Sequence, residues 1–536
     1  MACTTILVGK DASYDGSTII ARNEDSANGE FNPKRFIVVK PSEQPRTYTS
    51  VISHLTIDLP DDPLQYTAVP NADLKEGVWG EAGVNEANVA MSATETLTTN
   101  ERVLGADPFV EYAPAKGREG EEGYEPAAPG GIGEEDFLTI VLPYVKTARE
   151  GVRRLGALLE QYGTYEMNGV AFSDVNEIWW LETVGGHHWI AKRVPDEAYV
   201  TMPNQLGIDE FDLEDALGDQ KEHMCSADLA EFIESNHLDL AVESGSPFAP
   251  RDAFGSHSDS DHVYNTPRAW YMQRFLNPYD EMWDGQDADH RPTSDDIPWA
   301  RQPERKVTIE DVKYVLSSHY QGTPFDPYGQ LGDDRTRHLY RPIGINRQSQ
   351  LSVMQIRPYR PQASRAIQWL AYGSNPFNTL VPFFPNVDST PAYLENTTTR
   401  VTTENFYWEN RVIAALCDGA FRSTANAVER YQEKTGAMGH RLVAATDEQV
   451  ARLDLGDASP EAVADEFDAD NANGDVEPME PDAVIAATRN AEVRAILAAA
   501  NQTMADQLKE ETDKLLDSVL YTRSMEMKNG FHMSDF

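Results

Sequence analysis

The chain has 536 residues, of which 40% are hydrophobic, and its 88 acidic side chains outnumber 45 Lys and Arg, giving a formal net charge of −43. Such an acidic chain repels nucleic acid and anionic membranes, because binding to phosphates needs clustered cations. The length and nine tryptophans suffice for one large domain with insertions, or for a core with an appendage.

The sequence holds three cysteines, Cys3, Cys225 and Cys417, and no CxxC pair. So few thiols argue against a disulfide framework and fit a reducing compartment. No basic segment followed by an apolar run opens the chain, and no apolar run reaches the ~18 residues of a membrane span. We therefore expect a soluble, cytoplasmic protein.

Two strands are predicted at the start of the chain. Residues 4–10, "TTILVGK", are β-branched and apolar, like a strand buried on both faces, and residues 17–22, "STIIAR", follow a turn. If these strands pair antiparallel about a loop at 10–15, Cys3 falls opposite Arg22. That pairing places a cation beside the thiol.

The middle of the chain alternates strands, an insertion and a helix. Residues 77–96 predict two strands around a turn, and residues 112–133, rich in Gly, Pro and Glu, predict a mobile insertion. The stretch after this insertion predicts a helix that is kinked or broken at Pro143.

Four short apolar runs separated by turn residues between 168 and 204 predict a β-meander. Two adjacent histidines there, His187 and His188, lie at a strand start, where neighbouring side chains point to opposite faces. One packed and one exposed histidine is therefore favoured over a metal site.

The composition changes near residue 434. Residues 434–481 are acidic and rich in turn formers, like a surface linker. In the remaining segment, 482–536, apolar residues from Val493 to Leu520 recur at helical spacing, which predicts a long C-terminal helix that packs on the core or on a partner subunit.

A cysteine this near the start of a chain suggests one particular chemistry. Cysteine is a good nucleophile as thiolate, and its free pKa is about 8.5. A cysteine at the N-terminus has a base of its own, an α-amine with a pKa of roughly 7.7–8.0. This requires that Met1 and Ala2 be removed, and we expect Cys3 to catalyse the second cut itself.

Seven stretches in order carry a resemblance to a known family: "CTTILVGKDAS.DGSTIIARNEDS", "ERVLGADPFVE", "GIGEEDFLTIVLPY", "ETVGGHHWIAKRVPD", "GTPFDPYG", "RPIGINRQSQ" and "FYWENRV". With this series the sequence resembles the cysteine dipeptidases of lactic-type bacteria, the peptidase D family, and more distantly choloylglycine hydrolases and penicillin V acylases. This resemblance implies an α+β fold, the αββα sandwich of N-terminal-nucleophile (Ntn) hydrolases, as a catalytic domain over 3–433. It implies no metal and no organic cofactor.

The resemblance also implies roles for five residues. Cys3 would be the nucleophile, and Arg22 a cation near its sulfur. Asp25, three residues later, would orient the α-amine or bind a substrate amine. Asn204, in "VTMPNQ", matches an oxyanion-hole Asn, and Arg268, in "YNTPRAWYMQRF", matches a second active-site Arg.

One position departs from the acylase pattern. Where the acylases have another Asn, this chain has Thr94 and Glu95, in "SATET". The second oxyanion donor therefore stays open, with a backbone N–H as one candidate. An acid there would attract a substrate's amino group, which suits a dipeptidase and makes both residues candidate substrate-binding groups.

The function expected is hydrolysis of dipeptides through a thioester on Cys3. Two alternatives remain: a linear-amide acylase, and a non-catalytic acidic binding protein on the same fold. The partners expected are small dipeptide substrates, with neither nucleic acid nor membrane, and homo-oligomerisation stays open.

Overall fold

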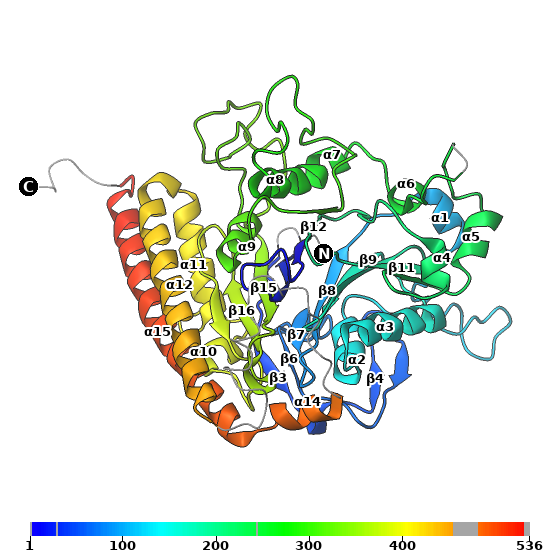
Figure 1. Cartoon of the computed structure of the whole chain (residues 1–536), viewed down its shortest axis with the longest axis horizontal. Coiled ribbons are helices and arrows are strands. Elements are labelled where there is room, and N and C mark those ends of the chain that lie inside the picture. Colours follow the sequence, from blue (N-terminus) through cyan, green and yellow to red (C-terminus); the bar gives the residue numbers. More distant parts are fainter. Residues whose placement is uncertain (1–2, 28–29, 243–244, 454–480, 530–536) are drawn as a thin grey trace, which may run out of the picture.

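The computed structural model describes residues 3–27, 30–242, 245–453 and 481–529, and shows an α+β architecture built on two antiparallel sheets (Figure 1). The seven-stranded sheet has the order β14 (Ala300–Arg301), β12 (Tyr199–Met202), β1 (Thr4–Val8), β2 (Thr18–Asp25), β15 (Gln348–Ile356), β16 (Ala366–Tyr372) and β17 (Val381–Phe383). The six-stranded sheet has the order β13 (His223–Cys225), β11 (Trp189–Arg193), β10 (Ile178–Thr183), β9 (Asn168–Ser173), β8 (Ala90–Thr96) and β7 (Ala82–Val84). Two smaller pairs join β3 (Ile37–Val39) to β6 (Tyr66–Ala68) and β4 (Thr47–Thr49) to β5 (Thr56–Asp58).

The two large sheets pack face to face through apolar side chains. Leu7 and Ile20, from β1 and β2, share one buried cluster with Ala171 and Trp180 of the six-stranded sheet. The alternate side chains of β1 point the other way, into a second cluster on the opposite face. Apolar surface on both faces explains why β1 is an almost continuous hydrophobic run, as its sequence predicts.

Helices cover the outer faces of both sheets. On the seven-stranded sheet, α8 (Thr266–Leu276) and α9 (Ile309–Leu316) contribute Met272 and Val312 to the cluster that contains Ile6. On the six-stranded sheet, α2 (Phe137–Val141) and α3 (Ala148–Tyr162) pack against its outward-facing residues. The order of layers is therefore helix, sheet, sheet, helix.

Three long helices lie against β16 and β17, as the yellow, orange and red ribbons in Figure 1 show. They are α11 (Phe406–Asp418), α12 (Phe421–Ala451) and α15 (Ala491–Met525). Met504 and Leu508 of α15 pack with Leu370 of β16, so the predicted C-terminal helix forms and packs on the core. Asn490 caps α15 by accepting N–H bonds from its first turn.

Shorter helices complete the described chain and lie mainly in the connections. They are α1 (Glu101–Ala106), α4 (Leu213–Leu217), α5 (Leu229–Ser235), α6 (Pro250–Phe254), α7 (Asp261–Tyr264), α10 (Ala392–Glu395) and α14 (Pro481–Thr488). Three 3-10 turns are η1 (Pro41–Glu43), η2 (Leu142–Tyr144) and η3 (Gln362–Ser364).

The predicted meander is correct for three of its four strands. β9, β10 and β11 pair in sequence, but β12 leaves them and pairs with β1 in the other sheet. The apolar pattern predicts strands without assigning them to a sheet, which explains the error. The predicted break at Pro143 is confirmed, since Pro143 lies in η2 between α2 and α3.

Parts of the predicted segments 434–481 and 112–133 have regular backbone structure. Lys434, where the composition changes, lies within α12, and residues 454–480 lie outside the described residues. In the segment 112–133, backbone bridges join Ala113 to Ala128, and Ile132 is buried beside α3's C-terminal end.

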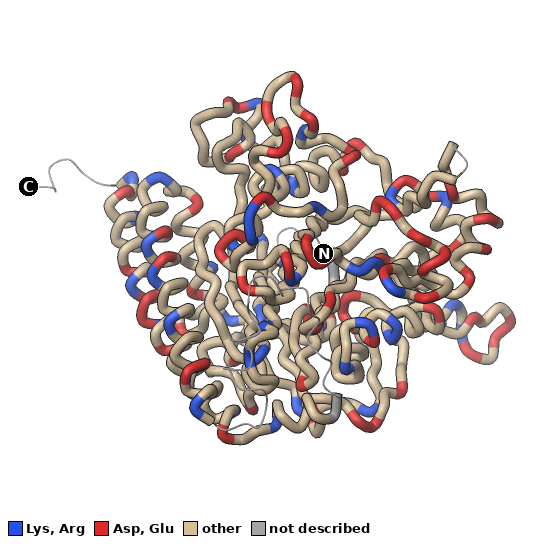
Figure 2. Tube along the Cα trace, viewed as in Figure 1, with Lys and Arg blue, Asp and Glu red and all other residues tan. Residues whose placement is uncertain are grey.

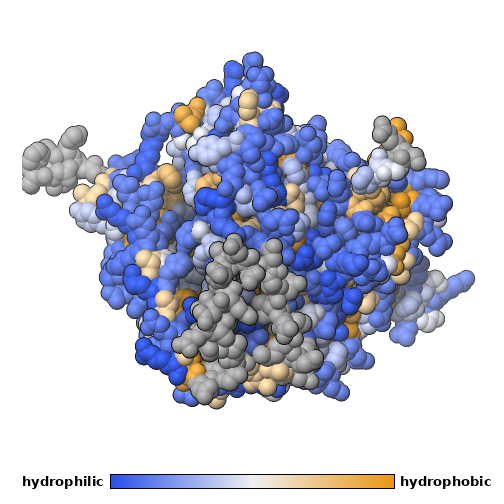
Figure 3. All heavy atoms as spheres, in the orientation of Figure 1, coloured by the Kyte–Doolittle hydropathy of each residue, from blue (hydrophilic) through white to orange (hydrophobic). Residues whose placement is uncertain are grey.

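Acidic and basic residues are interspersed over the trace (Figure 2), and the face in Figure 3 is largely hydrophilic with scattered apolar spots. Within the described ranges, no helix combines the length and the apolar character needed to cross a bilayer.

Candidate active site

The sulfur of Cys3 lies beside a guanidinium. Cys3 is fully buried just before β1, and Nη2 of Arg22 lies 3.1 Å from its Sγ. The expected register was wrong by two residues, because Thr5, not Cys3, lies opposite Arg22. A shift of two keeps both side chains on the same face, and a long side chain reaches its diagonal neighbour. A cation therefore stands beside the thiol, where it favours the thiolate.

Arg22 is held in place by three acceptors on the six-stranded-sheet side. Its Nη1 donates to Glu81 Oε2 at 2.6 Å and also to the carbonyl of Ala93, while Nη2 donates to Glu134 Oε1 at 2.9 Å. Burial works to lower the pKa of Arg22, but Cys3, Glu81 and Glu134 together raise that pKa well above its ordinary value. The guanidinium is thus a fixed positive charge whose orientation is set by Glu81, Glu134 and the Ala93 carbonyl.

A second buried cation extends this network. Nζ of Lys34 lies 2.7 Å from Glu24 Oε1 and 3.5 Å from Glu81 Oε1, and all three side chains are fully buried. Burial, followed by the charge of Glu24, raises the pKa of Glu81 to about 8. Burial also raises the pKa of Glu24, against the effects of Lys34 and Arg22. Glu81 therefore accepts a proton near neutral pH.

Arg268 lies on the opposite face of β1 and fixes the backbone of the nucleophile. It comes from α8, and its Nη1 donates to the carbonyl of Cys3 and to Thr4 Oγ1 at 2.7 Å. Its Nη2 donates to Asn204 Oδ1 at 2.6 Å and to Asn265 Oδ1 at 2.8 Å. One buried arginine therefore joins the start of β1 to the turn that carries Asn204.

The amide of Asn204 is oriented by its partners. Because Oδ1 accepts from Arg268, Nδ2 points the other way and donates to the carbonyl of Thr96 at 2.8 Å. The backbone N–H of Asn204 donates to Asn265 Oδ1. An amide nitrogen carries two donors, so this geometry leaves Asn204 with a second N–H beyond the bond to Thr96.

Asp25 is the last residue of β2, and its side chain lies on the face of the strand opposite Arg22. It is fully buried, its Oδ2 pairs with Arg341, and its Oδ1 has no hydrogen-bond partner within the part of the chain that the structure describes. Burial raises the pKa of Asp25, while Arg341, Arg347 and Arg268 act to lower it. An acceptor oxygen without a partner is thus held near the start of β1.

The structure describes the backbone of Thr94 and Glu95, but their side chains lie outside the described residues. The ladder between β8 and β9 is irregular between Ala93 and Glu95. The carbonyls on either side, of Ala93 and Thr96, accept hydrogen bonds from the arginine and the asparagine described above. This irregularity therefore lies within the site, where such features often redirect side chains.

The other candidate groups lie in ordinary packed settings. Cys225 and Cys417 are buried free thiols, and burial raises their pKa values to about 12 and about 11. His187 and His188 both place Nδ1 against Asp107, at 3.1 and 2.7 Å. His188 is the more buried of the two.

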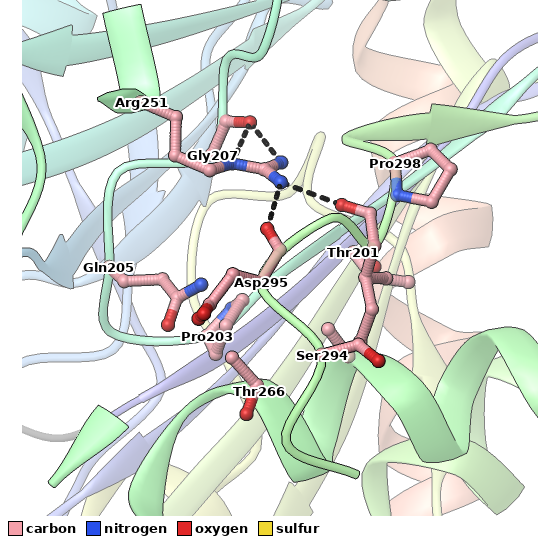
Figure 4. A pocket seen from close by; sticks show the side chains of 11 residues that line it. Thr201, Pro203, Gln205, Gly207, Arg251, Thr266, Ser294, Asp295 and Pro298 are labelled. Carbon is pink, nitrogen blue, oxygen red and sulfur yellow. Dashed lines mark hydrogen bonds between the residues drawn. The ribbon is translucent and has the colours of Figure 1, made fainter. Parts of the chain in front are cut away.

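A small cavity next to α8 has a volume of about 10 Å³, room for about one water. Figure 4 shows Arg251 at this cavity, donating to the carbonyls of Gly207 and Asp295. Arg251 also donates to the carbonyl of Ile297. Arg251 therefore ties loops together, and the cavity is too small for a peptide.

Sequence reasoning missed the residues that support the site. Glu81, Glu134 and Lys34 hold the network around Arg22, Asn265 supports Asn204, and Arg341 pairs with Asp25. The sequence feature that could have indicated these residues is an acid next to an apolar run, as in "GEEDFLTIV". Charged residues are so seldom fully buried that this pattern is normally assigned to the surface.

Comparison with known proteins identifies the family to which the chain belongs. A protein 88% identical over 539 residues, covering all of both chains, is named "Dipeptidase", from Bifidobacterium longum. "Probable dipeptidase A" of Streptococcus pyogenes serotype M3 is 51% identical over 535 residues, also covering all of both chains. "Dipeptidase A" of Lactobacillus helveticus is 43% identical over 454 residues, 84% of this chain and 89% of its own. The model described as Peptidase family C69 matches residues 2–434, and the chain therefore belongs to that family.

Proposed function

We propose that this protein is a dipeptidase whose nucleophile is the Cys3 thiolate. The observation that carries the proposal is the 3.1 Å contact between Arg22 Nη2 and Cys3 Sγ, in a chain of a peptidase family. A fixed guanidinium favours ionisation of the thiol, and the thiolate is the nucleophilic form. The names of the related dipeptidases support peptides of two residues as substrates.

The fold proposed is the αββα sandwich of the Ntn hydrolases. Two antiparallel sheets packed face to face, with helices on both outer faces, support it. So does the position of Cys3 at the start of a central strand, because that fold presents its nucleophile there.

The base in this proposal is the α-amine of Cys3 itself. Met1 and Ala2, which lie outside the described residues, must then be removed, because an acylated nitrogen has no basicity. Asp25 suits the freed amine, since its Oδ1 is a buried acceptor that no described group satisfies. We expect the cut before Cys3 to be autocatalytic, by attack of its thiol on the Ala2 carbonyl.

The reaction proceeds in two halves. The amine takes the thiol proton, Sγ bonds to the scissile carbonyl carbon, and the C–N bond breaks as the amine returns that proton to the leaving nitrogen. Water then adds its oxygen to the thioester carbon, the C–S bond breaks, and the acid is released with the thiol restored. No step uses a metal or an organic cofactor.

Asn204 is the proposed oxyanion donor, with Arg268 fixing its amide. The N–H of its Nδ2 that is not committed to Thr96 suits a developing negative charge. A backbone N–H at the irregular end of β8 is the candidate for the second donor.

Recognition of the substrate's amino group is assigned to two acids, one at the end of β2 and one near the end of β8. Glu95, next to Thr94 at the irregular end of β8, and Asp25 are the candidates. A free ammonium group attracted by a carboxylate distinguishes a dipeptide from an acylated amide. We expect the enzyme to act on small peptides in the cytoplasm, without nucleic acid or membrane partners.

The test is a panel of dipeptides, with tripeptides and an acyl-amide substrate as controls, before and after iodoacetamide. The proposal expects dipeptide hydrolysis that disappears as Cys3 is labelled. Preferred cleavage of the acyl-amide would instead indicate an acylase. If no substrate is hydrolysed, the result would indicate a binding protein.

A further inference from the structure

Arg347 places a guanidinium next to the end of β2. It directly precedes Gln348, which pairs with Asp25, and its own carbonyl accepts the N–H of Ser26 at 2.9 Å. Its Nη2 donates to the hydroxyl of Tyr264 at 2.6 Å, and its Nη1 to the carbonyl of Ser26 at 3.3 Å. Within the described residues, two of the five N–H donors of this half-buried guanidinium are therefore used.

Arg347 has no carboxylate partner among the residues in the described ranges. Arg341, close by, differs in this respect, because it pairs with Asp25. The ring of Tyr264 also lies 5.2 Å from Arg268 Cζ and 5.1 Å from Arg341 Cζ. Arg347 and Arg268 thus act on the carboxylate of Asp25 together with its ion-pair partner Arg341.

A fourth arginine adds to this charge. Arg411 is 6% exposed, and its Nη1 donates to the carbonyl of Asn346, the residue before Arg347. Its Nη2 is buried and has no hydrogen-bond partner in the described part of the chain. Its guanidinium stacks at 4.6 Å on the ring of Phe31, which is 58% exposed. A buried cation without an acid marks a place that favours an anion.

We infer that Arg347, reinforced by the charge of Arg411, binds the C-terminal carboxylate of the substrate. The inference rests on the proposed dipeptidase function and explains why the enzyme would accept peptides of two residues and reject longer ones. In a dipeptide the carboxylate lies only one residue beyond the scissile bond, and adjacent Cα atoms are about 3.8 Å apart. The anion must therefore bind close to the nucleophile.

A series of contacts links the two places, through the backbone of Cys3 and not its sulfur. Arg268 contacts the Cys3 carbonyl, Tyr264 lies over Arg268, and the hydroxyl of Tyr264 accepts from Arg347. A longer peptide presents an amide where a dipeptide presents its carboxylate. The amide carries no charge, so it cannot neutralise Arg347, and the longer substrate is rejected.

The experiment compares kcat/KM for a dipeptide, for the same dipeptide with a C-terminal amide, and for a tripeptide extended at its C-terminus. We expect the wild-type enzyme to prefer the free acid by ~10- to 100-fold, the range of a charge-assisted pair. Arg347→Gln should lower kcat/KM for the acid by a similar factor, through KM, with little change for the amide. Arg347→Lys should recover part of the preference, because it keeps the positive charge. The recovery should be incomplete, because lysine lacks the paired N–H donors of the planar guanidinium.

The matched control is Arg251→Gln. Arg251 is likewise an arginine without an ion pair among described residues, but it donates to backbone carbonyls of two loops. We expect this change to alter stability and to leave the ratio of acid to amide hydrolysis unchanged.

Two results would overturn the inference while the proposed function stands. One is a wild-type enzyme that cleaves dipeptides and their amides equally well, which needs no variant to fold. The other is an Arg347→Gln enzyme that loses both activities by the same factor, or neither. A wild-type protein that hydrolyses no dipeptide contradicts the proposed function itself, and the inference with it.

Discussion

Nη2 of Arg268 donates to Oδ1 of Asn204 at 2.6 Å, so an arginine on a helix sets which way the asparagine amide points. Nδ2 is thereby turned toward the Thr96 carbonyl and the end of β8. The same arginine contacts the Cys3 carbonyl, so one side chain fixes both the nucleophile's strand and the proposed oxyanion donor.

We predict that Asn204→Ala lowers kcat by ~10²–10³ while the protein still folds, as for loss of a single oxyanion donor. Steady-state kinetics, with circular dichroism to confirm folding, measures this. Asn265→Ala, which removes a support of Asn204 rather than the donor, should have a smaller effect. A folded Asn204→Ala enzyme with near-normal kcat would remove Asn204 from the mechanism.

Arg22→Gln should make the thiol harder to ionise. Loss of an adjacent opposite charge typically moves a pKa by ~1–3 units, so iodoacetamide labelling of Cys3 should require a correspondingly higher pH. The pH dependence of the labelling rate, followed by peptide mass spectrometry, gives the midpoint. Arg149→Gln, which breaks a 3.0 Å pair with Glu177 elsewhere, is the control. An unchanged midpoint in Arg22→Gln would show that the guanidinium does not stabilise the thiolate.

Glu81 predicts a pH dependence of stability. Burial raises its pKa to about 8 in the folded protein, from an ordinary value of 4.5. Between these values the folded state holds a proton that the unfolded state has lost, so the free energy of unfolding falls as pH rises, by at most about 1.4 kcal/mol per pH unit for one proton. The contribution of Glu81 to the free energy of unfolding is fully present below pH 4.5 and is lost above pH 8.

The corresponding measurement is urea unfolding at several pH values from 5 to 8. Glu81→Gln cannot titrate, so its free energy of unfolding should fall less steeply over this range than that of the wild type. Glu433→Gln, on the exposed side of α12, serves as control. Parallel curves for wild type and Glu81→Gln would mean that Glu81 does not hold the extra proton.

N-acetylated dipeptides should be poor substrates. Acetylation removes the ammonium charge, so the substrate loses its charge-assisted hydrogen bond to a carboxylate. A comparison of kcat/KM for one dipeptide and its acetylated form measures the difference. Equal values would contradict recognition of the amine by Asp25 and Glu95 and would revive the acylase alternative.

The strands that position Cys3 could be predicted because their apolar patterns are strong. Residues 4–10 and 17–22 contain β1 and much of β2, which pair as expected. The pattern predicts which residues share a face of the sheet, but it does not predict which residues lie opposite each other. A shift of two residues preserves the side-chain alternation, and the pattern does not distinguish Cys3 from Thr5 as the partner of Arg22.

The support of the site was harder to predict. Glu24, Lys34, Glu81 and Glu134 come from different elements and meet only after the two sheets pack. Each alone has the composition of a surface residue. The departure of β12 from the meander has a similar cause, since its partner is separated from it by most of the first 200 residues.

The most direct test of the central claim is the intact mass of purified, active protein, measured beside its dipeptidase activity. We predict that the active chain begins at Cys3, because only then is an α-amine available as the base. A Cys3→Ala variant should retain Ala2 and be inactive, since it has neither the nucleophile nor the thiol that makes the cut. Fully active enzyme that still carries Ala2 would show that the α-amine of Cys3 is not the base.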